Sequence, residues 1–473
     1  MNKSSDNKVY PWVLERFARA TRASISGGGL SAQYEAVATD SRRLPPTCIF
    51  LALKGPHFNG HDFVEDVLKQ GCRAIVVEES ELPRLKKFIG DDVTVLAVDN
   101  TLRAYGEIAA LHRRQMASPL VAITGSNGKT STKEFVASIL AVRGSIHKTQ
   151  GNFNNLIGVP RTLLEWRENA WVSVLEMGMN EPGELRRLVK MGSPSVGLIT
   201  NVAPAHLEGL KSVEGVAKAK GELFDGLPLN AIGVINTDDD LIKEYCVPFL
   251  ARRPRILFGR SMSNDVYLSK SVVRENGLEV LLMVENTSLE VTVPVLGEHQ
   301  ALNVAGAIAA SIGVGATLAE IEEGLARVEL PGGRMKLIKV RDDFRVIDDT
   351  YNANPASMLA AGKALVELSK FGPTAAILGD MGELGEKSER LHFEVGTKFT
   401  EMGVEHIVAV GPLGQALIEG ARLAGAKSAH HVGMEEDIAG LVKGFLDDRG
   451  WVLVKGSRSM RMERVVEALS EAD

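Results

Sequence analysis

The chain has 473 residues, of which 45% are hydrophobic and 24% are charged, and its formal net charge is −6. This length suffices for about three domains, and the composition excludes a globally disordered chain. Acidic and basic residues are mixed along the sequence, so the molecule as a whole is not a binder of nucleic acid. The only cysteines are Cys48, Cys72 and Cys246. Because they lack CxxC spacing, they indicate buried thiols in a reducing cytoplasm.

The first region, residues 1–115, is predicted to be a small α/β domain. Apolar runs at 49–53 and 74–77 are typical of buried strands, and residues 62–70 between them are predicted to form a helix. The start of the chain lacks an apolar stretch, so we expect no signal peptide. Polar residues gather in the loops, which is equally compatible with a scaffold and with a ligand site.

The second region, residues 116–330, alternates apolar strands with helical or loop stretches. The predicted strands are 120–124, 171–175, 196–201 and 232–236. This alternation is typical of a parallel sheet with helices on both faces, and ligands collect at the carboxyl ends of such strands. Polar side chains recur at those ends: residues 125–130, Glu176, Asn201 with His206, and Asn236 with 238–240. The pattern therefore predicts one site.

A short glycine loop follows the first of these strands and precedes a helical pattern. It consists of Gly125, Ser126, Asn127, Gly128, Lys129, Thr130 and Ser131. Glycines let backbone N–H groups approach phosphate oxygens, Lys129 can neutralise their charge, and the Thr130 hydroxyl can reach Mg²⁺. The loop is about two residues shorter than the common G-x-x-x-x-G-K-[ST] pattern. A structural glycine turn is the alternative, but the flanking strand and helix favour nucleotide phosphate.

One segment, residues 299–319, carries no formal charge and is long enough to span a bilayer. It contains Gln300, Asn303 and several small residues, however. We therefore predict a buried helix that ends near Gly313 and Gly315, and no membrane insertion.

The third region, residues 331–473, is predicted to be a further α/β domain. Strands are expected at 345–347, 375–378, 406–410 and 452–454, and helices at 357–368 and 434–446. Glycines close several of these strands, as in dinucleotide-binding folds, but no G-x-G-x-x-G follows the first strand. The predicted fold class is thus α/β with three domains: a central phosphate-loop sheet, a small N-terminal domain and a C-terminal dinucleotide-fold-like domain.

Single residues in these patterns leave their roles open. Glu176 at a strand end suits Mg²⁺, although an acid that caps a helix or lies at the surface is the alternative. A lone histidine such as His206 is usually an ordinary polar residue. Lys218 and Lys220 are typical of a solvated helix face. The amide-rich loop 149–160 and the turn 348–355 are compatible with either capping or ligand binding.

Ordered motifs make the interpretation specific. They are the loop 125–131, the segments 152–160, 176–184, 201–206, 297–303 and 333–334, and, in the first region, 40–42 and 60–63. Their order resembles that of the ATP-dependent Mur ligases of peptidoglycan synthesis, over nearly the whole chain. Within that family, segments 348–355, 378–385 and 455–458 most resemble the branch that adds D-alanyl-D-alanine.

The resemblance implies roles for individual residues. Thr130 and Glu176 are expected to hold one Mg²⁺, and His206 with Glu176 a second. Lys220 stands four residues before Phe224, as the family's modified lysine stands before an aromatic residue, so it is a candidate for carbamylation. The remaining assignments are Asn303, Arg334 and Asp349 around the adenine, phosphate and ribose of ATP; Ser41 and Arg42 at the UDP end of the substrate; and Asn154, Asn155, Asn352 and Asn354 as further substrate ligands. Gln300 departs from the family pattern, where asparagine is expected.

The resemblance also implies the reaction, in which ATP and Mg²⁺ serve an amide ligase that joins D-alanyl-D-alanine to UDP-N-acetylmuramoyl-tripeptide. An acyl phosphate would form first, with Lys129, Mg²⁺ and Arg334 neutralising charge. Because water would hydrolyse that intermediate, the three regions are expected to close over it. We expect a cytoplasmic monomer, and the third peptide residue, lysine or diaminopimelate, stays open.

Three alternatives share parts of this pattern. Folylpolyglutamate synthase has a similar phosphate loop but needs no region for UDP. A sibling ligase that adds a single amino acid is disfavoured by the segment 352–355. A nucleotide-dependent switch without ligase activity would bind ATP but release no phosphate in response to an amine.

Overall fold

The computed structural model describes residues 12–28, 32–55, 58–341, 344–370, 372–446 and 450–471. The chain divides into two compact units. Unit 1 comprises Met1–Ala122, Gly144–Met179 and Glu184–Ser195, and unit 2 comprises Ile123–Arg143, Asn180–Gly183 and Val196–Asp473. The first residues of the chain, on which the expectation about a signal peptide depends, lie outside the described residues.

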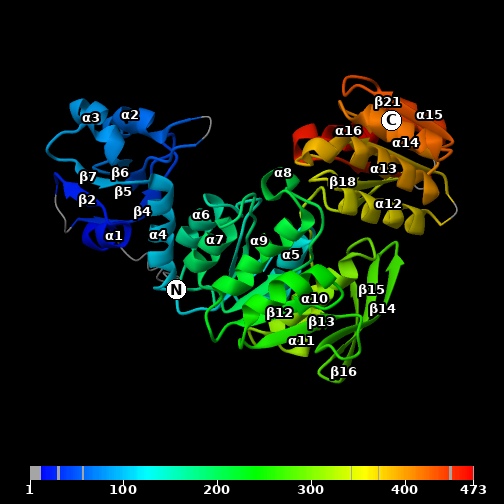
Figure 1. Ribbon diagram of the computed structural model, residues 1–473, viewed down its shortest axis with the longest axis horizontal. Coiled ribbons are helices and arrows are strands. Elements are labelled where there is room, and N and C mark those ends of the chain that lie inside the picture. The colour runs from blue at the N-terminus through cyan, green and yellow to red at the C-terminus, as the bar shows by residue number, and fades with distance from the viewer. Residues whose placement is uncertain are drawn as a thin grey trace, which may run out of the picture. The chain divides into compact units, whose positions relative to one another are not determined.

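Unit 1 contains a five-stranded sheet in the order β2-β7-β6-β5-β4 (Figure 1). Its strands are β2 (Ser24–Ser26), β4 (Ala36–Ala38), β5 (Cys48–Leu51), β6 (Ala74–Glu78) and β7 (Thr94–Val98). All neighbours are parallel except β2 with β7. The helices are α1 (Leu14–Thr21), α2 (Val64–Lys69), α3 (Leu82–Leu85) and α4 (Thr101–Arg113). The predicted strands at 49–53 and 74–77 and the helix within 62–70 are therefore confirmed.

Helices cover both faces of this sheet because successive strand residues point to opposite sides. In β5, Ile49 and Leu51 pack into the core formed with α1 and α4, whereas Phe50 packs into the core formed with α2 and α3. All three side chains are buried. The continuous apolar run in the sequence thus reflects a parallel strand buried on both faces.

The largest sheet has nine strands in the order β16-β15-β14-β13-β12-β11-β8-β10-β9. The strands are β8 (Leu120–Thr124), β9 (Ile146–Lys148), β10 (Val172–Glu176), β11 (Val196–Ile199), β12 (Ile232–Asn236), β13 (Arg255–Gly259), β14 (Val266–Arg274), β15 (Gly277–Val284) and β16 (Thr287–Val293). The pairs β9–β10, β11–β12, β12–β13 and β13–β14 are parallel, whereas β14, β15 and β16 form antiparallel hairpins. The four predicted strands are confirmed; the hairpins were not predicted.

The helices of the middle region follow the strands in alternation. They are α5 (Lys129–Ala141), α6 (Gly158–Glu165), α7 (Glu184–Gly192), α8 (Leu207–Leu210), α9 (Val213–Gly226), α10 (Gln300–Ile312) and α11 (Leu318–Ala326). The uncharged segment forms α10, which is mostly buried and ends at Gly313, as predicted. Among the described residues, no helix has the length and hydropathy needed to cross a bilayer.

The last part of unit 2 contains a six-stranded sheet in the order β17-β18-β22-β19-β20-β21. Its elements are β17 (Lys336–Arg341), β18 (Phe344–Asp349), α12 (Pro355–Ser369), β19 (Thr374–Gly379), α13 (Ser388–Glu401), β20 (His406–Val410), α14 (Gly414–Leu423), β21 (Ser428–Val432), α15 (Ile438–Leu446), β22 (Gly450–Lys455) and α16 (Glu463–Glu471). Only β17 runs antiparallel to its neighbour. One core packs against α12, α13 and α14, and the other against α15 and α16, so the predicted two-faced α/β arrangement is confirmed.

Candidate nucleotide and substrate sites

The glycine loop turns between β8 and α5 as predicted. Gly128 caps α5 with φ of 78°, a left-handed conformation that glycine adopts without strain. A Cβ atom on Gly128 would collide with the side-chain amide of Asn303, and one on Gly125 with the hydroxyl of Thr200. The absence of side chains at these two positions therefore lets the loop lie directly against α10 and β11.

Neighbouring side chains fix the shape of the loop. Asn127 N donates to Asn201 Oδ1 at 2.9 Å, and Asn127 O accepts from Asn201 Nδ2 at 3.0 Å and from Thr200 Oγ1 at 2.6 Å. Ser126 Oγ donates to a backbone carbonyl at 2.9 Å. Lys129 Nζ bends back to the carbonyl of Gly125 at 2.7 Å. The polar residue at the end of β11 thus acts on the loop, as the strand-end pattern predicted.

The C-terminal part of unit 2 adds an arginine to the loop. Arg334 Nη2 donates to Thr130 Oγ1 at 2.7 Å, and its guanidinium carbon lies 4.1 Å from the ring centroid of Tyr351. The Nε atom of Arg334 is buried and has no hydrogen-bond partner among the described residues. A buried donor without an acceptor is costly, so an anionic oxygen at this point would be stabilised.

Asn354 also contacts the loop. Its Nδ2 donates to Asn127 Oδ1 at 2.6 Å, while its Oδ1 caps α12 by accepting from Ser357 N at 2.9 Å. Asn352 Oδ1 accepts from the next backbone N–H at 2.9 Å, and its carbonyl accepts from Lys455 Nζ at 2.9 Å. The predicted turn therefore combines capping with contact to the phosphate loop.

Asn303 and Gln300 lie in the first turn of α10 and are both buried. Asn303 Nδ2 donates to Gln300 Oε1 at 2.9 Å, so glutamine orients Asn303 beside Gly128. The departure from the family pattern at Gln300 thus still provides a hydrogen bond that holds Asn303 against the loop.

Asp349 ends β18 opposite Lys455 of β22. Its Oδ2 lies 2.5 Å from Lys455 Nζ, and its Oδ1 accepts from Met335 N at 3.2 Å. Both side chains are largely buried. The carboxylate is thus held in place within unit 2, and its predicted contact with ribose stays a prediction.

His206 and Lys220 belong to neighbouring elements of unit 2. His206 Nδ1 lies 2.5 Å from Glu383 Oε2 of the C-terminal part. Lys218 is exposed, as predicted, but Lys220 is fully buried in α9, so the prediction of a solvated lysine is wrong at this position. Burial, reinforced by the positive charge of Lys129, holds the pKa of Lys220 well below its usual range. A buried, uncharged amine is the form that carbamylation requires, and the modification itself stays a prediction.

Glu176 ends β10 in unit 1 and is 3% exposed, so it is not a surface acid. Its Oε1 accepts from Asn154 Nδ2 at 2.8 Å, and its N–H donates to Thr149 Oγ1 at 3.0 Å. Asn155 Oδ1 accepts from the backbone N–H groups of Ile157 and Gly158 at the start of α6. Asn154 therefore orients the predicted metal ligand, whereas Asn155 has a capping contact.

The predicted Mg²⁺ ligands are divided between the units, because Thr130 and His206 belong to unit 2 and Glu176 to unit 1. The part of the chain that the structure describes contains no group of three or more His, Cys, Asp or Glu side chains that could hold a metal. The predicted set needs only two side chains of these types beside a hydroxyl and ATP oxygens. It stays a prediction.

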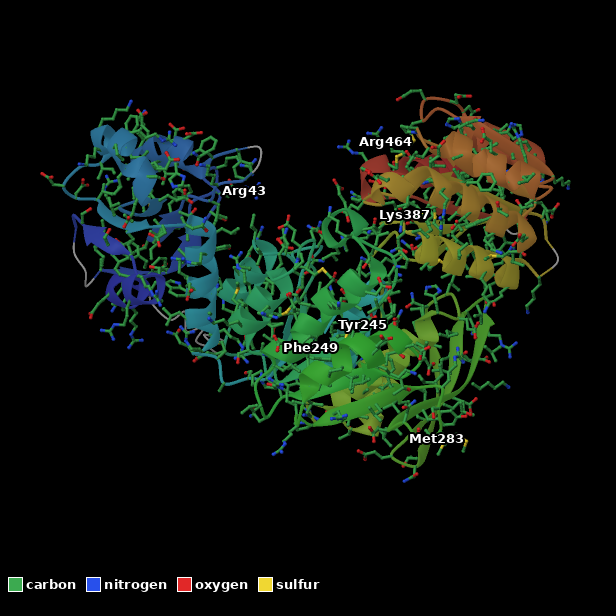
Figure 2. The ribbon with its side chains drawn as sticks, in the orientation of Figure 1. Arg43, Tyr245, Phe249, Met283, Lys387 and Arg464 are labelled. Atoms are coloured by element: carbon green, nitrogen blue, oxygen red, sulfur yellow. The ribbon has the colours of Figure 1, made fainter. Side chains whose placement is uncertain are left out.

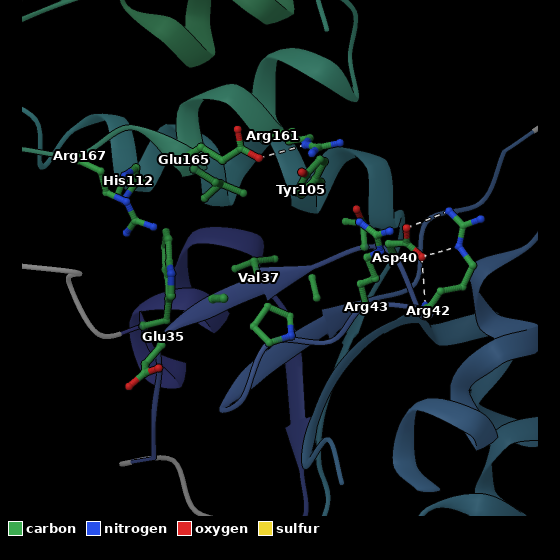
Figure 3. A pocket seen from close by; sticks show the side chains of 16 residues that line it. Glu35, Val37, Asp40, Arg42, Arg43, Tyr105, His112, Arg161, Glu165 and Arg167 are labelled. Carbon is green, nitrogen blue, oxygen red and sulfur yellow. Dashed lines mark hydrogen bonds and ion pairs between the residues drawn. The ribbon is translucent and has the colours of Figure 1, made fainter. Parts of the chain in front are cut away.

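Unit 1 contains a cavity of about 820 Å³ between β4, the loop that follows it, α4 and α6 (Figure 3). Four arginines line it: Arg42, Arg43, Arg161 and Arg167. Arg43 projects from the loop that follows β4 (Figure 2). Arg42 is paired through two 2.9 Å contacts with Asp40, and Arg161 with Glu165 at 3.0 Å. Arg43 and Arg167 form no ion pair with any described residue.

The predicted UDP residues differ in their relation to this cavity. Arg42 lines it, whereas Ser41 does not, and the Ser41 carbonyl accepts from Gln70 Nε2 at 3.1 Å. Arg43, Arg167 and His112 were not predicted from the sequence. His112 is 6% exposed, and its Nε2 contacts the carbonyl of Trp166, whereas its Nδ1 has no hydrogen-bond partner in the described part of the chain. The pair of adjacent arginines at 42 and 43 was the available signal.

Three family models match consecutive parts of the chain. They are the Mur ligase family catalytic domain at residues 33–113, the Mur ligase middle domain at 123–311 and the Mur ligase glutamate ligase domain at 333–458. A protein of Escherichia coli named UDP-N-acetylmuramoyl-tripeptide--D-alanyl-D-alanine ligase is 37% identical over 94% of this chain and 95% of its own length. This chain belongs to the Mur ligase family. Each domain match falls within one of the three predicted regions.

Solved structures of related proteins superpose closely on this Mur ligase. A crystal structure of MurF from Acinetobacter baumannii superposes with a TM-score of 0.89 at 30% identity, covering 98% of this chain and 100% of that one. A MurF ligase from Thermotoga maritima, in complex with ADP, superposes with a TM-score of 0.80 at 26% identity, covering 92% and 97%. The three-domain α/β fold and an ATP- and Mg²⁺-dependent ligase activity are thereby established for the chain.

Proposed function

We propose that this Mur ligase joins D-alanyl-D-alanine to UDP-N-acetylmuramoyl-tripeptide with hydrolysis of ATP to ADP and phosphate, in the synthesis of peptidoglycan precursors. The observation that carries the proposal is the full-length similarity to an enzyme of that name, at 37% identity. The contact of Arg334 with Thr130 supports it, because it brings a second cation to the phosphate loop from another part of the chain.

The side chains of unit 2 fit a nucleotide. Gly128 lets the start of α5 lie against Asn303, and the buried Nε of Arg334 lacks an acceptor among the described residues. The N-terminus of α5 favours negative charge at the same place. Thr130 and Glu176 would supply oxygen donors, which Mg²⁺ prefers, and His206 would be a less usual nitrogen ligand beside the oxygens of ATP; the metal would supply charge neutralisation for phosphoryl transfer.

The reaction proceeds in two steps. A carboxylate oxygen of the tripeptide attacks the γ-phosphorus of ATP, the bond to ADP breaks, and an acyl phosphate results. The neutral dipeptide nitrogen then attacks the acyl carbon, the C–O bond to phosphate breaks, and the nitrogen releases one of its two protons to solvent as the amide forms. Lys129 must exchange its bond to the Gly125 carbonyl for the phosphate, and Arg334 neutralises the growing charge beside it.

We infer that the cavity of unit 1 receives the UDP end of the substrate. A diphosphate needs cations that are not already neutralised, and Arg43 and Arg167 meet that condition better than Arg42, which is paired with Asp40. The unpartnered Nδ1 of His112 offers one further polar contact. Ser41 does not line the cavity, so we assign it no direct contact with the diphosphate.

The substrate assignments of four asparagines change accordingly. Asn154 and Asn354 keep a place in the reaction by orienting Glu176 and Asn127, respectively. The side-chain oxygens of Asn352 and Asn155 already accept hydrogen bonds from backbone N–H groups. Around ATP we retain Asn303 for adenine and Asp349 for ribose, and we retain carbamylation of Lys220.

We place the protein in the cytoplasm as a monomer, because its nucleotide substrates are cytoplasmic and its cysteines are buried free thiols. The UDP cavity argues against folylpolyglutamate synthesis, which needs no such region. A nucleotide-dependent switch would bind ATP without forming an acyl phosphate.

A single assay tests the proposal. Purified protein is incubated with Mg-ATP, UDP-muramoyl-tripeptide carrying either lysine or diaminopimelate, and a panel of amines, while phosphate release is followed. We expect release that depends on D-alanyl-D-alanine. Release with folate and glutamate, or with a single amino acid, would transfer the function to another member of the family. Binding of ATP without any amine-stimulated release would support the switch.

A further inference from the structure

The proposed mechanism leaves one charged side chain near the phosphate loop without a role. Glu383 lies in the turn that follows β19, and its Oε2 is 2.5 Å from Nδ1 of His206. Both residues have left-handed backbone conformations, with φ of 61° for Glu383 and 53° for His206. Such conformations are uncommon for residues other than glycine and persist where the surrounding structure imposes them.

The turn that carries Glu383 is anchored on both sides. Met381 and Leu384 are each 2% exposed and belong to the core formed with α12, α13 and α14. Met381 N donates at 2.9 Å to Nε2 of His392, which is itself fully buried. Asp380 at the end of β19 accepts from Leu413 N at 3.1 Å. The carboxylate is therefore presented by a fixed turn between buried side chains.

The surroundings of Glu383 combine positive charge with access for a ligand. The ammonium group of Lys129 is close enough to interact electrostatically with Glu383, whose carboxylate contacts the imidazole of His206. The side chain is 58% exposed although its Oε2 contacts His206. An anionic oxygen thus stands open beside the loop that, under the proposed function, holds the reacting phosphate.

We propose that Glu383 is a positioning residue that binds the ammonium group of the incoming dipeptide and, once this group has released one proton to solvent, directs its neutral nitrogen toward the acyl phosphate, a role that rests on the proposed function. The amine arrives largely as a cation, because an α-amino group has a pKa of about 8, and Lys129 and Arg334 would repel it from the reaction centre. A fixed carboxylate offsets that repulsion and forms a charge-assisted hydrogen bond.

The test compares Glu383→Gln and Glu383→Asp with Glu386→Gln. Glu386 is an exposed carboxylate in the same segment and forms no ion pair within the described part of the chain, so its variant controls for the loss of one negative charge. For Glu383→Gln we expect the KM for D-alanyl-D-alanine to rise about tenfold or more, since hydrogen bonds to charged groups contribute roughly 1.5–3 kcal/mol. Glu383→Asp should recover part of the loss, and Glu386→Gln should behave as the wild type.

Two further measurements separate positioning from other roles. Single-turnover formation of acyl phosphate without amine, trapped by borohydride reduction, should be unchanged in Glu383→Gln, as should the Mg²⁺ concentration for half-maximal rate. A parallel loss of acyl phosphate or a raised Mg²⁺ requirement would overturn the proposal, because Glu383 would then act on ATP or the metal. An unchanged KM for the dipeptide would overturn it too. If D-alanyl-D-alanine did not stimulate phosphate release by the wild-type enzyme, the proposed function would be refuted instead.

Discussion

The phosphate loop of unit 2 and the cavity of unit 1 are both candidate sites for phosphate groups, but they are built differently. In the loop, glycines at fixed positions, a helix N-terminus and one lysine follow a strand within a few residues. In the cavity, arginines come from the loop after β4, from α6 and from the segment that follows α6. The first site is local in sequence, whereas the second is assembled by tertiary structure.

This difference also affects how each site responds to change. The phosphate loop is held in place by several hydrogen bonds, because Asn127 by itself is bonded to Asn201, Thr200 and Asn354. The cavity arginines are separate side chains, of which two lack ion pairs within the described residues. We therefore expect substitutions in the loop to act on catalysis as a unit, and substitutions in the cavity to act separately on one substrate.

The largest effect is expected for Lys129→Ala. The variant should lose about 10²- to 10³-fold in kcat, because it removes the loop cation that stabilises the transferred phosphoryl group. The midpoint of thermal unfolding should stay close to that of the wild type, since the hydrogen bonds of Lys129 to the carbonyls of Gly125 and Ser126 stay within its own loop.

Lys218→Ala is the matched control for this variant, because Lys218 is exposed on α9 and keeps its side chain outside the loop. Its kcat should equal that of the wild type. If Lys129→Ala lost its thermal transition instead, Lys129 would be a structural residue and the phosphate assignment would be wrong.

A smaller loss, about 10- to 100-fold in kcat/KM for ATP, is expected for Gly128→Ala. A left-handed backbone disfavours alanine by about 1–2 kcal/mol, and the new Cβ would also displace Asn303. Gly315→Ala separates the two causes, since Gly315 has φ of 85° and open space around its Cβ position. That control should lose stability without any change in the KM for ATP; equal kinetic losses in both variants would show that the close approach to Asn303 is unimportant.

In the cavity, Arg167→Ala should raise the KM for the UDP substrate about tenfold, because one charge-assisted contact is lost. Arg42→Ala should have a weaker effect, since Asp40 already neutralises Arg42. The KM for ATP should be unchanged in both variants. If Arg42→Ala were the more damaging change, the argument from ion pairing with Asp40 would be wrong, and if neither variant affected the UDP substrate, the site would have to be placed elsewhere in unit 1.

The part of the architecture that follows from local pattern was predictable from the sequence. Buried parallel strands such as β8 and β20 are continuous apolar runs, and α10 is an uncharged helical segment closed by glycine. The hairpins of β14, β15 and β16 were missed because their alternating polar residues resemble surface loops when the partner strands are unknown.

The candidate site was predictable where one residue type has one chemical use, as in Gly125, Gly128 and Lys129. It was not predictable where the environment decides the role. Lys220 looks like a solvated lysine in the sequence, yet its side chain is buried, and burial lowers the pKa of its amine. Glu383 became a candidate only because the fold carries it to His206 from a distant part of the chain.

The smallest effect is expected in the pH dependence of the free energy of unfolding. It concerns two buried histidines of unit 1, of which His112 lines the cavity and His61 does not. Burial lowers the pKa of His112, which lines the cavity, and that of His61, which is 1% exposed and accepts from Glu78 N through Nε2 at 2.9 Å. A histidine with a lowered pKa binds its proton more tightly in the unfolded chain. Its contribution to folding is therefore fully present above the unfolded pKa of 6.5 and is lost as the pH falls through the folded pKa.

We therefore expect the free energy of unfolding to decrease below pH 6.5, by at most about 1.4 kcal/mol per pH unit for each of these histidines. Chemical denaturation at several pH values should show this slope in the wild type and a shallower one in His61→Gln and in His112→Gln. The two substitutions should add, because the side chains belong to separate hydrogen-bond arrangements, around Glu78 and Trp166. If His112→Gln kept the full slope, His112 would contribute nothing to it; protons would then reach His112 in the folded protein, and the cavity wall would be open to water.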